Sequence, residues 1–263
     1  APINNHKVTS NGNGNGLGKK ILITSGGTQE PIDAVRVLTN LSTGKTGARI
    51  AEQMLAQGFD VTYLHATTAK MPEIFCRQIP FTSFADIENK IQQILKTENF
   101  DAVIHAAAVS DFTNANPFAE KISSDQDLTI HLKRNPKIVN QLRAWSKNKN
   151  CKIIAFKMTA NANQESKLAA VSKLFNNADV DFVVQNDISE MSKDQHLFSL
   201  YTKTDNNNQL KCIVNLTTKN DLANWFCENL SEIKESSVTI EKNKMDIIQK
   251  ISPMIGNSPE VKI

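Results

Sequence analysis

The chain has 263 residues and a net charge of +3 at pH 7, with 40% hydrophobic and 22% charged residues. This composition is typical of an ordinary globular protein and excludes a collagen-like or wholly disordered chain. The charge imbalance is too small to favour nucleic acid or an anionic membrane as a partner, so any anionic ligand must be bound locally. No run approaches the roughly 18 apolar residues of a membrane span, and the first residues lack the apolar core of a secretory signal, so we expect a cytoplasmic protein.

The two ends of the chain differ in composition from the part between them. Residues 1–18 contain alternating Asn and Gly and predict a disordered leader, and residues 231–263 form a charged, weakly periodic tail without an assigned role. Residues 19–230 are expected to form the folded domain. Because the chain begins with Ala, it is either processed or the C-terminal part of a longer protein, and the sequence does not decide between these.

The folded part alternates between two kinds of periodicity in chain order. Short β-branched and aliphatic runs predict buried parallel strands, and apolar residues at helical spacing predict the helices between them. Strands are expected over 21–24, 60–64, 101–105, 152–156 and 181–185, and helices over 44–57, 87–95 and 164–176. This alternation predicts an α/β fold, a Rossmann-like three-layer αβα arrangement with a mainly parallel sheet.

Two segments interrupt this alternation. Residues 112–126 are polar and precede a short strand expected over 128–132, so they are interpreted as a lid loop over one end of the sheet. Residues 196–203 and 209–216 alternate in polarity around the turn 206–208, which predicts an antiparallel hairpin.

Three segments should meet at the carboxyl ends of the parallel strands, where ligands bind such sheets. They are 25–28, 40–45 and 106–111. Gly26 and Gly27 either let backbone approach a ligand or only form a tight turn. The run Ser42, Thr43, Gly44 and Lys45 has the hydroxyls, glycine and cation of a phosphate cradle, although its hydroxyls could instead only cap the following helix.

Other nucleotide motifs are absent from the sequence. Gly44–Thr46 resembles the end of a P-loop, but the required earlier glycine would fall at Thr39. No G-x-G-x-x-G follows the first strand, and neither Tyr63 nor Tyr201 has a lysine four residues later. An NAD(P)-dependent reductase of Rossmann-like fold is therefore disfavoured and stays an alternative, as does a non-catalytic nucleotide-binding module.

Cysteine and histidine residues are not spaced as metal ligands. The four cysteines form neither a C-x-x-C pair nor a zinc quartet, and are expected to be reduced and mostly buried: Cys76, Cys151, Cys212 and Cys227. Four histidines have no recognisable partner and are interpreted as surface or satisfied core residues: His65, His105, His131 and His196.

Taken in order, the motifs from about residue 20 to 230 resemble phosphopantothenoylcysteine synthetases. The family pattern Glu-Pro-(Ile/Leu)-Asp-x-Val-Arg is followed by Asn-x-Ser-(Ser/Thr)-Gly-Lys-x-Gly, and this combination is highly specific. The matching segments are 30–36, 40–47, 107–112, 121–122, 135–139 and 186–189. Ser123 and Ser124 stand where bifunctional bacterial members have further lysines, so the chain looks more like the stand-alone bacterial form, with the C-terminal half of a bifunctional protein as the other possibility.

The resemblance implies a ligase of coenzyme A biosynthesis. Such enzymes join 4'-phosphopantothenate to L-cysteine through an acyl-nucleotide, an acyl-cytidylate when CTP is used, and give 4'-phosphopantothenoylcysteine. CTP is the expected co-substrate, ATP the less favoured one, with Mg²⁺ as the metal. Family members are dimers, so we expect a homodimer with small-molecule substrates.

The resemblance also implies roles for individual residues. Asn40 would contact the acyl intermediate, and Arg36 would help to order that site or bind the substrate. Lys121 would assist activation, and Asp111 would hold the metal or the nucleotide. The further expected nucleotide-binding residues are Ala106, Ala107, Ala108, Pro136, Lys137, Ile138, Val139 and Phe156, with Lys167 and Lys173 as candidates from the next helix.

Overall fold

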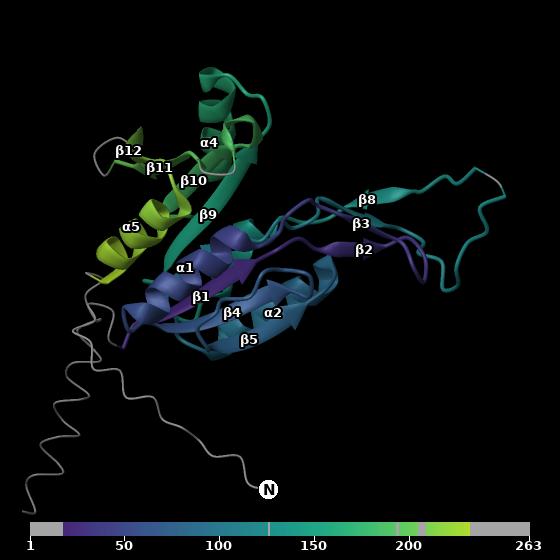
Figure 1. Cartoon of the computed structure of the whole chain (residues 1–263), viewed down its shortest axis with the longest axis horizontal. Coiled ribbons are helices and arrows are strands. Elements are labelled where there is room, and N and C mark those ends of the chain that lie inside the picture. The colour runs from purple at the N-terminus through teal and green to yellow at the C-terminus, as the bar shows by residue number, and fades with distance from the viewer. Residues whose placement is uncertain (1–17, 126, 193–194, 205–208, 232–263) are drawn as a thin grey trace, which may run out of the picture. The chain divides into compact units, whose positions relative to one another are not determined.

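The computed structural model describes residues 18–125, 127–192, 195–204 and 209–231 (Figure 1). The described residues form a compact unit that ends at Ser231. Apart from Gly18 and Ser231, the expected leader and tail lie outside the described residues, as do Gln126 of the expected lid and the whole of the expected hairpin turn, 206–208.

An eight-stranded sheet forms the centre of the fold, in the order β12-β11-β10-β9-β6-β1-β4-β5. The six strands from β5 to β10 in this order are parallel to one another. Strand β11 pairs antiparallel with both β10 and β12. The expected mainly parallel sheet and antiparallel hairpin are therefore confirmed. The strands are β1 (Lys20–Ser25), β4 (Asp60–Ala66), β5 (Arg77–Phe81), β6 (Ala102–His105), β9 (Lys152–Thr159), β10 (Phe182–Asp187), β11 (Phe198–Lys203) and β12 (Leu210–Leu216).

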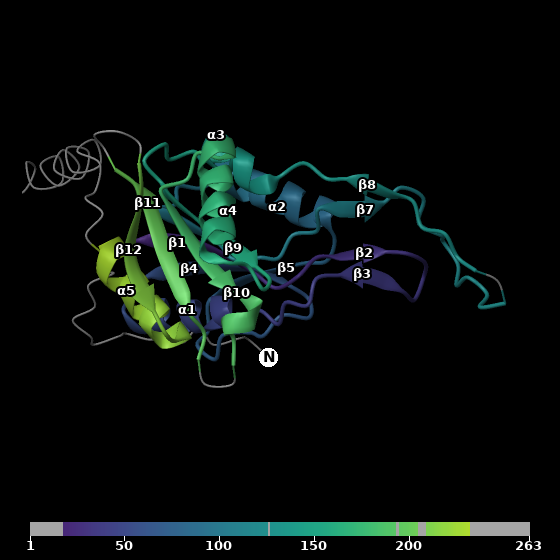
Figure 2. The same ribbon diagram turned by 90° about the horizontal axis from the view of Figure 1, so that it is seen from above.

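Helices cover both faces of this sheet, which completes the expected three layers (Figures 1 and 2). Two of the helices begin at a residue whose side chain accepts a hydrogen bond from a first-turn N–H group, Ser83 before α2 and Asn163 before α4. Helices α1 and α5 pack against each other. The bounds are α1 (Lys45–Ala56), α2 (Phe84–Thr97), α3 (Leu142–Trp145), α4 (Gln164–Asn177) and α5 (Lys219–Ser231), with 3-10 turns η1 (Ile138–Gln141) and η2 (Ile188–Glu190).

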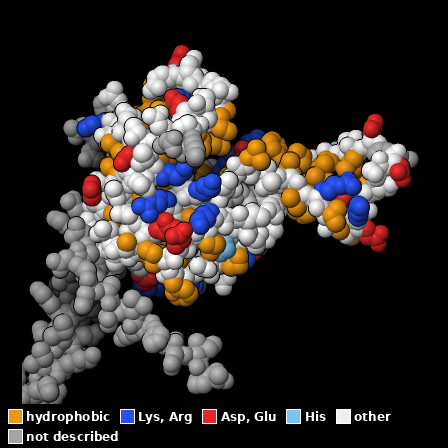
Figure 3. Space-filling view, in the orientation of Figure 1, with side chains coloured by type: hydrophobic (Ala, Val, Ile, Leu, Met, Phe, Trp, Pro, Cys, Tyr) orange, Lys and Arg blue, Asp and Glu red, His pale blue; other side chains and the backbone are white. Residues whose placement is uncertain are grey.

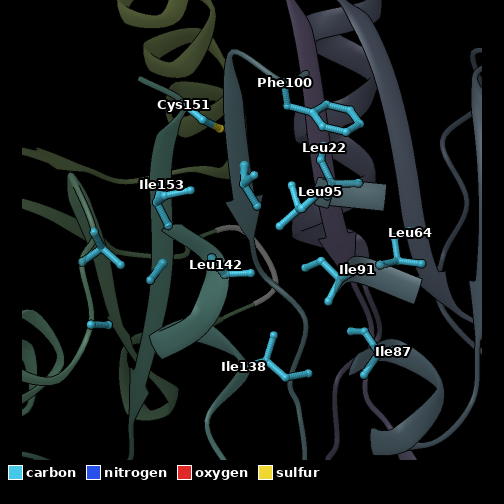
Figure 4. Close-up of a cluster of buried hydrophobic side chains, with 14 of the residues drawn as sticks. Leu22, Leu64, Ile87, Ile91, Leu95, Phe100, Ile138, Leu142, Cys151 and Ile153 are labelled. Carbon is cyan, nitrogen blue, oxygen red and sulfur yellow. The ribbon is translucent and has the colours of Figure 1, made fainter. Parts of the chain in front are cut away.

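The hydrophobic core on the α2, α3 and α4 side of the sheet uses alternate strand residues, because successive side chains of a strand point to opposite faces. Leu22 of β1 and Ile153 of β9 lie in it with Ile91 of α2 and Leu142 of α3 (Figure 4). Ile138 of η1 belongs to the same cluster and is 2% exposed. Packing of Ile138 in the core therefore fixes the start of η1, the 3-10 turn that follows β8.

Two short hairpins outside the main sheet lie side by side and are called the arm here (residues 29–39 and 112–134; Figures 1 and 2). They are joined by hydrogen bonds from Phe118 N to Ile32 O, 3.0 Å, and from Thr113 Oγ1 to Glu30 Oε2, 2.6 Å. The strands are β2 (Gln29–Pro31), β3 (Val37–Thr39), β7 (Phe112–Asn114) and β8 (Leu132–Arg134).

The strand expected over 128–132 is wrong in position. The observed strand begins at Leu132, because its three residues pair with β7 in the register Phe112 with Arg134 and Asn114 with Leu132. The expected lid is thus the loop of this second hairpin, with its first residues in a strand.

All four cysteines lie within the described residues and are free, and Cys212 is exposed whereas the other three are buried. Their expected state is confirmed. None of the helices in the described ranges is long and apolar enough to cross a membrane.

The carboxylate of Asp187, at the end of β10, holds together the loops that follow β9 and β10. Asp187 is completely buried and accepts hydrogen bonds from the hydroxyls of Ser189 and Thr159, both 2.6 Å, and from the N–H groups of Asn161 and Ala162, 3.0 and 3.1 Å. The Ser189 and Thr159 hydroxyls hold the pKa of Asp187 well below its ordinary value, against the opposing effect of burial.

We expect Asp187→Asn to lower the melting temperature at neutral pH by several degrees, because an amide nitrogen would face hydrogen-bond donors. The folded-state pKa is depressed, so the stabilisation is complete above the unfolded pKa of about 4 and is lost as the pH falls below it. Thermal melts followed by circular dichroism between neutral pH and about pH 3 should therefore fall less steeply for the variant than for the native chain. The control is Asp60→Asn, at a side chain that is 62% exposed. It should change neither the melting temperature at neutral pH nor the dependence of the melting temperature on pH. Equal melts for Asp187→Asn and the native chain would contradict this role.

Candidate active site

A cavity of about 810 Å³ opens at the carboxyl end of β6 and beside the middle of β9. The carboxyl ends of parallel strands are where open α/β sheets bind ligands. Four segments supply its walls: the end of β6 with the residues after it, the stretch from β8 through η1, the middle of β9, and one face of α4. The cavity is large enough for a nucleotide, since small-molecule sites are commonly 300–1,000 Å³.

The cavity combines apolar surface with excess positive charge. Ala155 and Ile138 are buried in the sheet and core below it, and Phe156 contributes an aromatic ring. The charged side chains that line it are Arg134, Lys137, Lys157, Lys173 and Asp111. Four cations against one carboxylate favour a polyanion, and the apolar part suits a flat ring, so the cavity fits a nucleotide with a polyphosphate chain.

Asp111 is the carboxylate expected to hold a metal ion. Its Oδ1 atom forms an ion pair with Nζ of Lys137, and both side chains are about half exposed. The described residues contain no group of three or more His, Cys, Asp or Glu that could enclose a metal. One carboxylate is nonetheless compatible with Mg²⁺, which is commonly held by one or two carboxylates together with substrate phosphates and water.

Eight of the expected site residues line the cavity: Ala107, Asp111, Pro136, Lys137, Ile138, Val139, Phe156 and Lys173. The other expected nucleotide-binding residues do not: Gly26, Gly27, Ser42, Thr43, Gly44, Lys45, Ala106, Ala108 and Lys167. Lys167 is instead buried in α4, where its Nζ pairs with Glu190.

The three segments expected to meet at the strand ends do so around Ala108. Its N–H group donates to Gly26 O, 2.8 Å, and its carbonyl accepts from Thr28 N, 3.3 Å, and from Asn40 Nδ2, 3.0 Å. A side chain at Gly27 would come within 2.8 Å of Asn40 O. Glycine at this position therefore permits the close approach of two backbones.

The start of α1 packs tightly against the end of β1. Gly44 precedes the helix with φ of 72°, a left-handed conformation that favours glycine, and its carbonyl accepts a hydrogen bond of 3.0 Å from Ser25 Oγ. A side chain at Gly47 would come within 2.4 Å of the same hydroxyl. These two glycines have a packing role in addition to any anion-binding role of the segment.

Asp33 and Arg36 hold the lid loop at Ile122, the residue after Lys121. The Asp33 carboxylate accepts from the N–H groups of Val35, Arg36 and Ile122, and the Arg36 guanidinium donates to Ile122 O, 2.9 Å. Burial opposes ionisation of Asp33, but the hydrogen bonds from Val35, Ile122 and Arg36 keep its pKa below the ordinary value. Both backbone groups of Ile122 are thus held by one turn of the arm.

The three residues expected to act on the reacting groups lie outside this cavity. Arg36 and Lys121 are on the arm, and Asn40 lies just after β3 with its side chain amide on Ala108. Lys121 is exposed. Within one chain, Arg36 therefore lies close to Ile122, the residue after Lys121. Neither Arg36 nor Lys121 lines the cavity of that chain.

Sequence reasoning missed several cavity residues that had a usable signal. Arg134 directly precedes the Asn-Pro-x-Ile-Val motif, and Lys157 directly follows Phe156. Ala170, Leu174 and Asn177 share a helix face with Lys173, because residues three and four apart in α4 lie on the same side. His105, at the end of β6, gave no such signal, since an isolated histidine is usually structural.

Comparisons with known proteins agree with this architecture. The family model described as "DNA/pantothenate metabolism flavoprotein C-terminal domain" matches residues 17–234. The chain is 36% identical over 173 residues to the coenzyme A biosynthesis bifunctional protein CoaBC of Methanocaldococcus jannaschii, covering 66% of this chain and 41% of that protein. For the protein of the same name from Bacillus subtilis, the identity is 34% over 173 residues, covering 65% and 41%. The chain spans less than half the length of these relatives.

Solved structures show the same fold. The DNA/pantothenate metabolism flavoprotein from Streptococcus pneumoniae superposes with a TM-score of 0.70 at 28% identity, covering 81% of this chain and 98% of that chain. The C-terminal domain of a coenzyme A biosynthesis bifunctional protein CoaBC gives 0.65 at 24% identity, covering 83% and 96%, and supports the fold. Because the family model matches a range that contains all of the described residues, the chain belongs to the DNA/pantothenate metabolism flavoprotein C-terminal domain family.

Proposed function

We propose that this chain is a phosphopantothenate–cysteine ligase, which joins 4'-phosphopantothenate and L-cysteine at the expense of a nucleoside triphosphate in coenzyme A biosynthesis. The relatives from M. jannaschii and B. subtilis are named as coenzyme A biosynthesis proteins. We expect this reaction to take place in the cytoplasm.

The observation that carries the proposal is the cavity at the end of β6 and beside β9, with four cations, one carboxylate and an apolar part. A reductase would require a site for a nicotinamide cofactor, and the turn after β1 lacks its glycine pattern. A polyphosphate nucleotide matches the charge of the lining.

The reaction requires activation, because a carboxylate has no adequate leaving group for attack by an amine. In the first step a carboxylate oxygen of 4'-phosphopantothenate bonds to the α-phosphorus of the nucleotide, and the bond from that phosphorus to pyrophosphate breaks. In the second step the cysteine amine attacks the acyl carbon, loses a proton, and the nucleoside monophosphate leaves.

The chain's polar residues would act at different steps. Lys121 would neutralise negative charge when the carboxylate approaches the phosphorus, as a positioned cation stabilises such a transition state. Asn40 would donate to the acyl oxygen as it gains charge in the second step, with Arg36 ordering the same group. Asp111 would hold Mg²⁺, which when bound supplies charge neutralisation on the phosphates.

We propose CTP as the co-substrate in preference to ATP. Pyrophosphate release should be measured with 4'-phosphopantothenate and Mg²⁺ and either CTP or ATP, with and without cysteine. We expect release with CTP in the absence of cysteine, and product and continued turnover only in its presence. No release with either nucleotide would contradict the proposed function, and faster release with ATP would contradict only the choice of base.

For Asn40→Asp we expect the acyl-nucleotide to form at near the native rate but to react with cysteine roughly 100- to 1,000-fold more slowly, the usual effect of removing one oxyanion donor. Quenched-flow separation of the acyl-nucleotide from the final product measures the two steps separately. Normal product formation by this variant would remove Asn40 from the mechanism.

For Lys121→Gln the defect should come earlier. We expect pyrophosphate release from CTP and 4'-phosphopantothenate to fall by roughly a hundredfold or more, because the cation that offsets the charge of the two anions is lost. Lys133→Gln, at an exposed lysine in β8 of the same arm, is the matched control and should retain the native rate. If Lys121→Gln released pyrophosphate as fast as the native chain, the activation role would be wrong.

We propose further that the protein acts as a homodimer whose sites use residues from both subunits. The arm presents exposed apolar side chains beside the main sheet (Figure 3), and β3 is exposed along its whole length. Eight of the 15 exposed large hydrophobic residues in the described part lie on or next to the arm: Val35, Val37, Leu38, Leu41, Phe112, Phe118, Leu128 and Leu132. Such a concentration favours contact with another protein surface.

A mixed dimer tests whether the sites are shared. Lys121→Gln on the arm and Lys173→Ala in the cavity should each be inactive as homodimers. If each cavity uses the other subunit's arm, a purified mixed dimer has one intact site and should show about half the native activity. If each chain supplied both residues to its own site, the mixed dimer would remain inactive.

The dimer itself is tested at the arm surface. Leu38→Glu should shift the chain to monomers in sedimentation equilibrium, because it places a charge on the apolar face of β3. Phe75→Glu, at a side chain that is 91% exposed outside the arm, should leave the mass unchanged. A native chain that sediments as a monomer would contradict the proposal directly.

A further inference from the structure

His105 is a buried histidine in the lining of the cavity that no part of the proposed reaction uses. It is the last residue of β6, it is 7% exposed, and it is among the residues that line the cavity, as is Ala107. Its Nδ1 atom lies 2.9 Å from the hydroxyl oxygen of Thr24 in the neighbouring strand β1.

The hydrogen bonds of Thr24 determine which ring nitrogen carries the proton. Thr24 Oγ1 accepts from the N–H group of Ala107 at 3.2 Å, and Thr24 is completely buried. A hydroxyl has one proton to donate, and His105 Nδ1 is the acceptor that the described residues offer it. A buried hydroxyl that left its proton unpaired would be penalised, so Nδ1 accepts and Nε2 carries the hydrogen.

The Nε2–H group has no hydrogen-bond partner among the described residues, yet it is not sealed inside the protein. The fully enclosed unpartnered side-chain atom in the described ranges is Nδ1 of His196, not Nε2 of His105. His105 lies two residues after Val103, so its side chain points to the same face of the sheet as Val103, the face that carries α4 and η1. Because His105 lines the cavity on this face and Nε2 is not enclosed, we infer that the unpaired donor faces the cavity space. Burial also lowers the pKa of His105 to about 4, so the ring is neutral near pH 7.

The neutral donor of His105 and the cations of the cavity suit different parts of a nucleotide. Arg134, Lys137, Lys157 and Lys173 already provide charge for phosphates. His105 instead lies at the buried strand end, with apolar Ala155 on the adjacent strand β9 as its register partner. A flat base can contact such apolar surface while its edge presents a ring nitrogen or carbonyl oxygen to a single donor.

We propose that the Nε2–H group of His105 donates a hydrogen bond to an acceptor on the nucleotide base, which makes His105 a specificity-determining residue of the cavity. The inference rests on the proposed use of a nucleoside triphosphate. A base that turned an amino group toward Nε2 would leave two donors facing each other, so this contact discriminates between bases by the position of their acceptors.

Binding measurements on the full chain with Mg²⁺ test the contact. For His105→Phe, which keeps a ring but removes the donor, we expect the dissociation constant for CTP to rise roughly 5- to 100-fold, as for one buried hydrogen bond lost. Affinity for inorganic tripolyphosphate, which has no base, should stay within about twofold of the native value. His105→Gln, which retains an N–H donor, should recover much of the lost affinity for CTP.

The variant His196→Phe provides a matched control. His196 is also buried and neutral near pH 7, with a pKa lowered to about 4 chiefly by burial, but it does not line the cavity. Its replacement should not change CTP affinity. Equal weakening by His196→Phe and His105→Phe would indicate a general loss of packing and would overturn the inference.

A measurement on the native chain avoids dependence on the folding of any variant. In ¹⁵N spectra of labelled histidines, His105 should appear as the Nε2–H form, and its Nε2 resonance should shift on addition of CTP but not of tripolyphosphate. An Nδ1–H form, or no response to CTP or ATP when either binds, would refute the assignment. Absence of binding by both nucleotides would instead contradict the proposed function.

Discussion

The backbone of Ala108 is the junction on which the arrangement of the candidate site depends. One N–H group and one carbonyl at the end of β6 connect the turn after β1 with the side chain of Asn40. Ala107, the preceding residue, lines the cavity. Because a parallel sheet aligns the carboxyl ends of its strands, this junction fixes the beginning of the arm relative to the cavity without any ligand.

The lid loop is held by the arm rather than by the cavity. Asp33 and Arg36 bind both backbone groups of Ile122, so the position of Lys121 depends on a turn far from it in sequence. Leaving the buried Asp33 carboxylate without its N–H donors would cost free energy. This cost favours the one arrangement of the loop in which Ile122 lies beside Asp33. The arm, which carries the exposed apolar side chains, thus positions Lys121 independently of the cavity of the same chain. In the proposed dimer, Lys121 would act at the cavity of the other subunit.

The sequence predicted five of the six parallel strands and the helices α1, α2 and α4, because their periodicity reflects burial that the final fold preserves. It missed the strand β5 and the helix α5. It failed where pairing alone determines structure: β2 and β3 are three residues each, and β8 begins at Leu132 because of its register with β7. Motif resemblance located part of the cavity, including Asp111 and Phe156. It did not locate Lys157, although this residue directly follows Phe156 in the sequence.

By itself the sequence determined the α/β fold, the three segments that meet at the strand ends, and the family resemblance, because these depend on local periodicity and on contiguous motifs. Only the tertiary structure decided that four cations from separate segments line one cavity, that Lys167 is paired with Glu190 instead, and that the hydroxyl of Thr24 lies beside Nδ1 of His105. The physical reason is that charge clusters and tautomers depend on which strands are neighbours. Thr24 and His105 are 81 residues apart in the chain and 2.9 Å apart in the sheet.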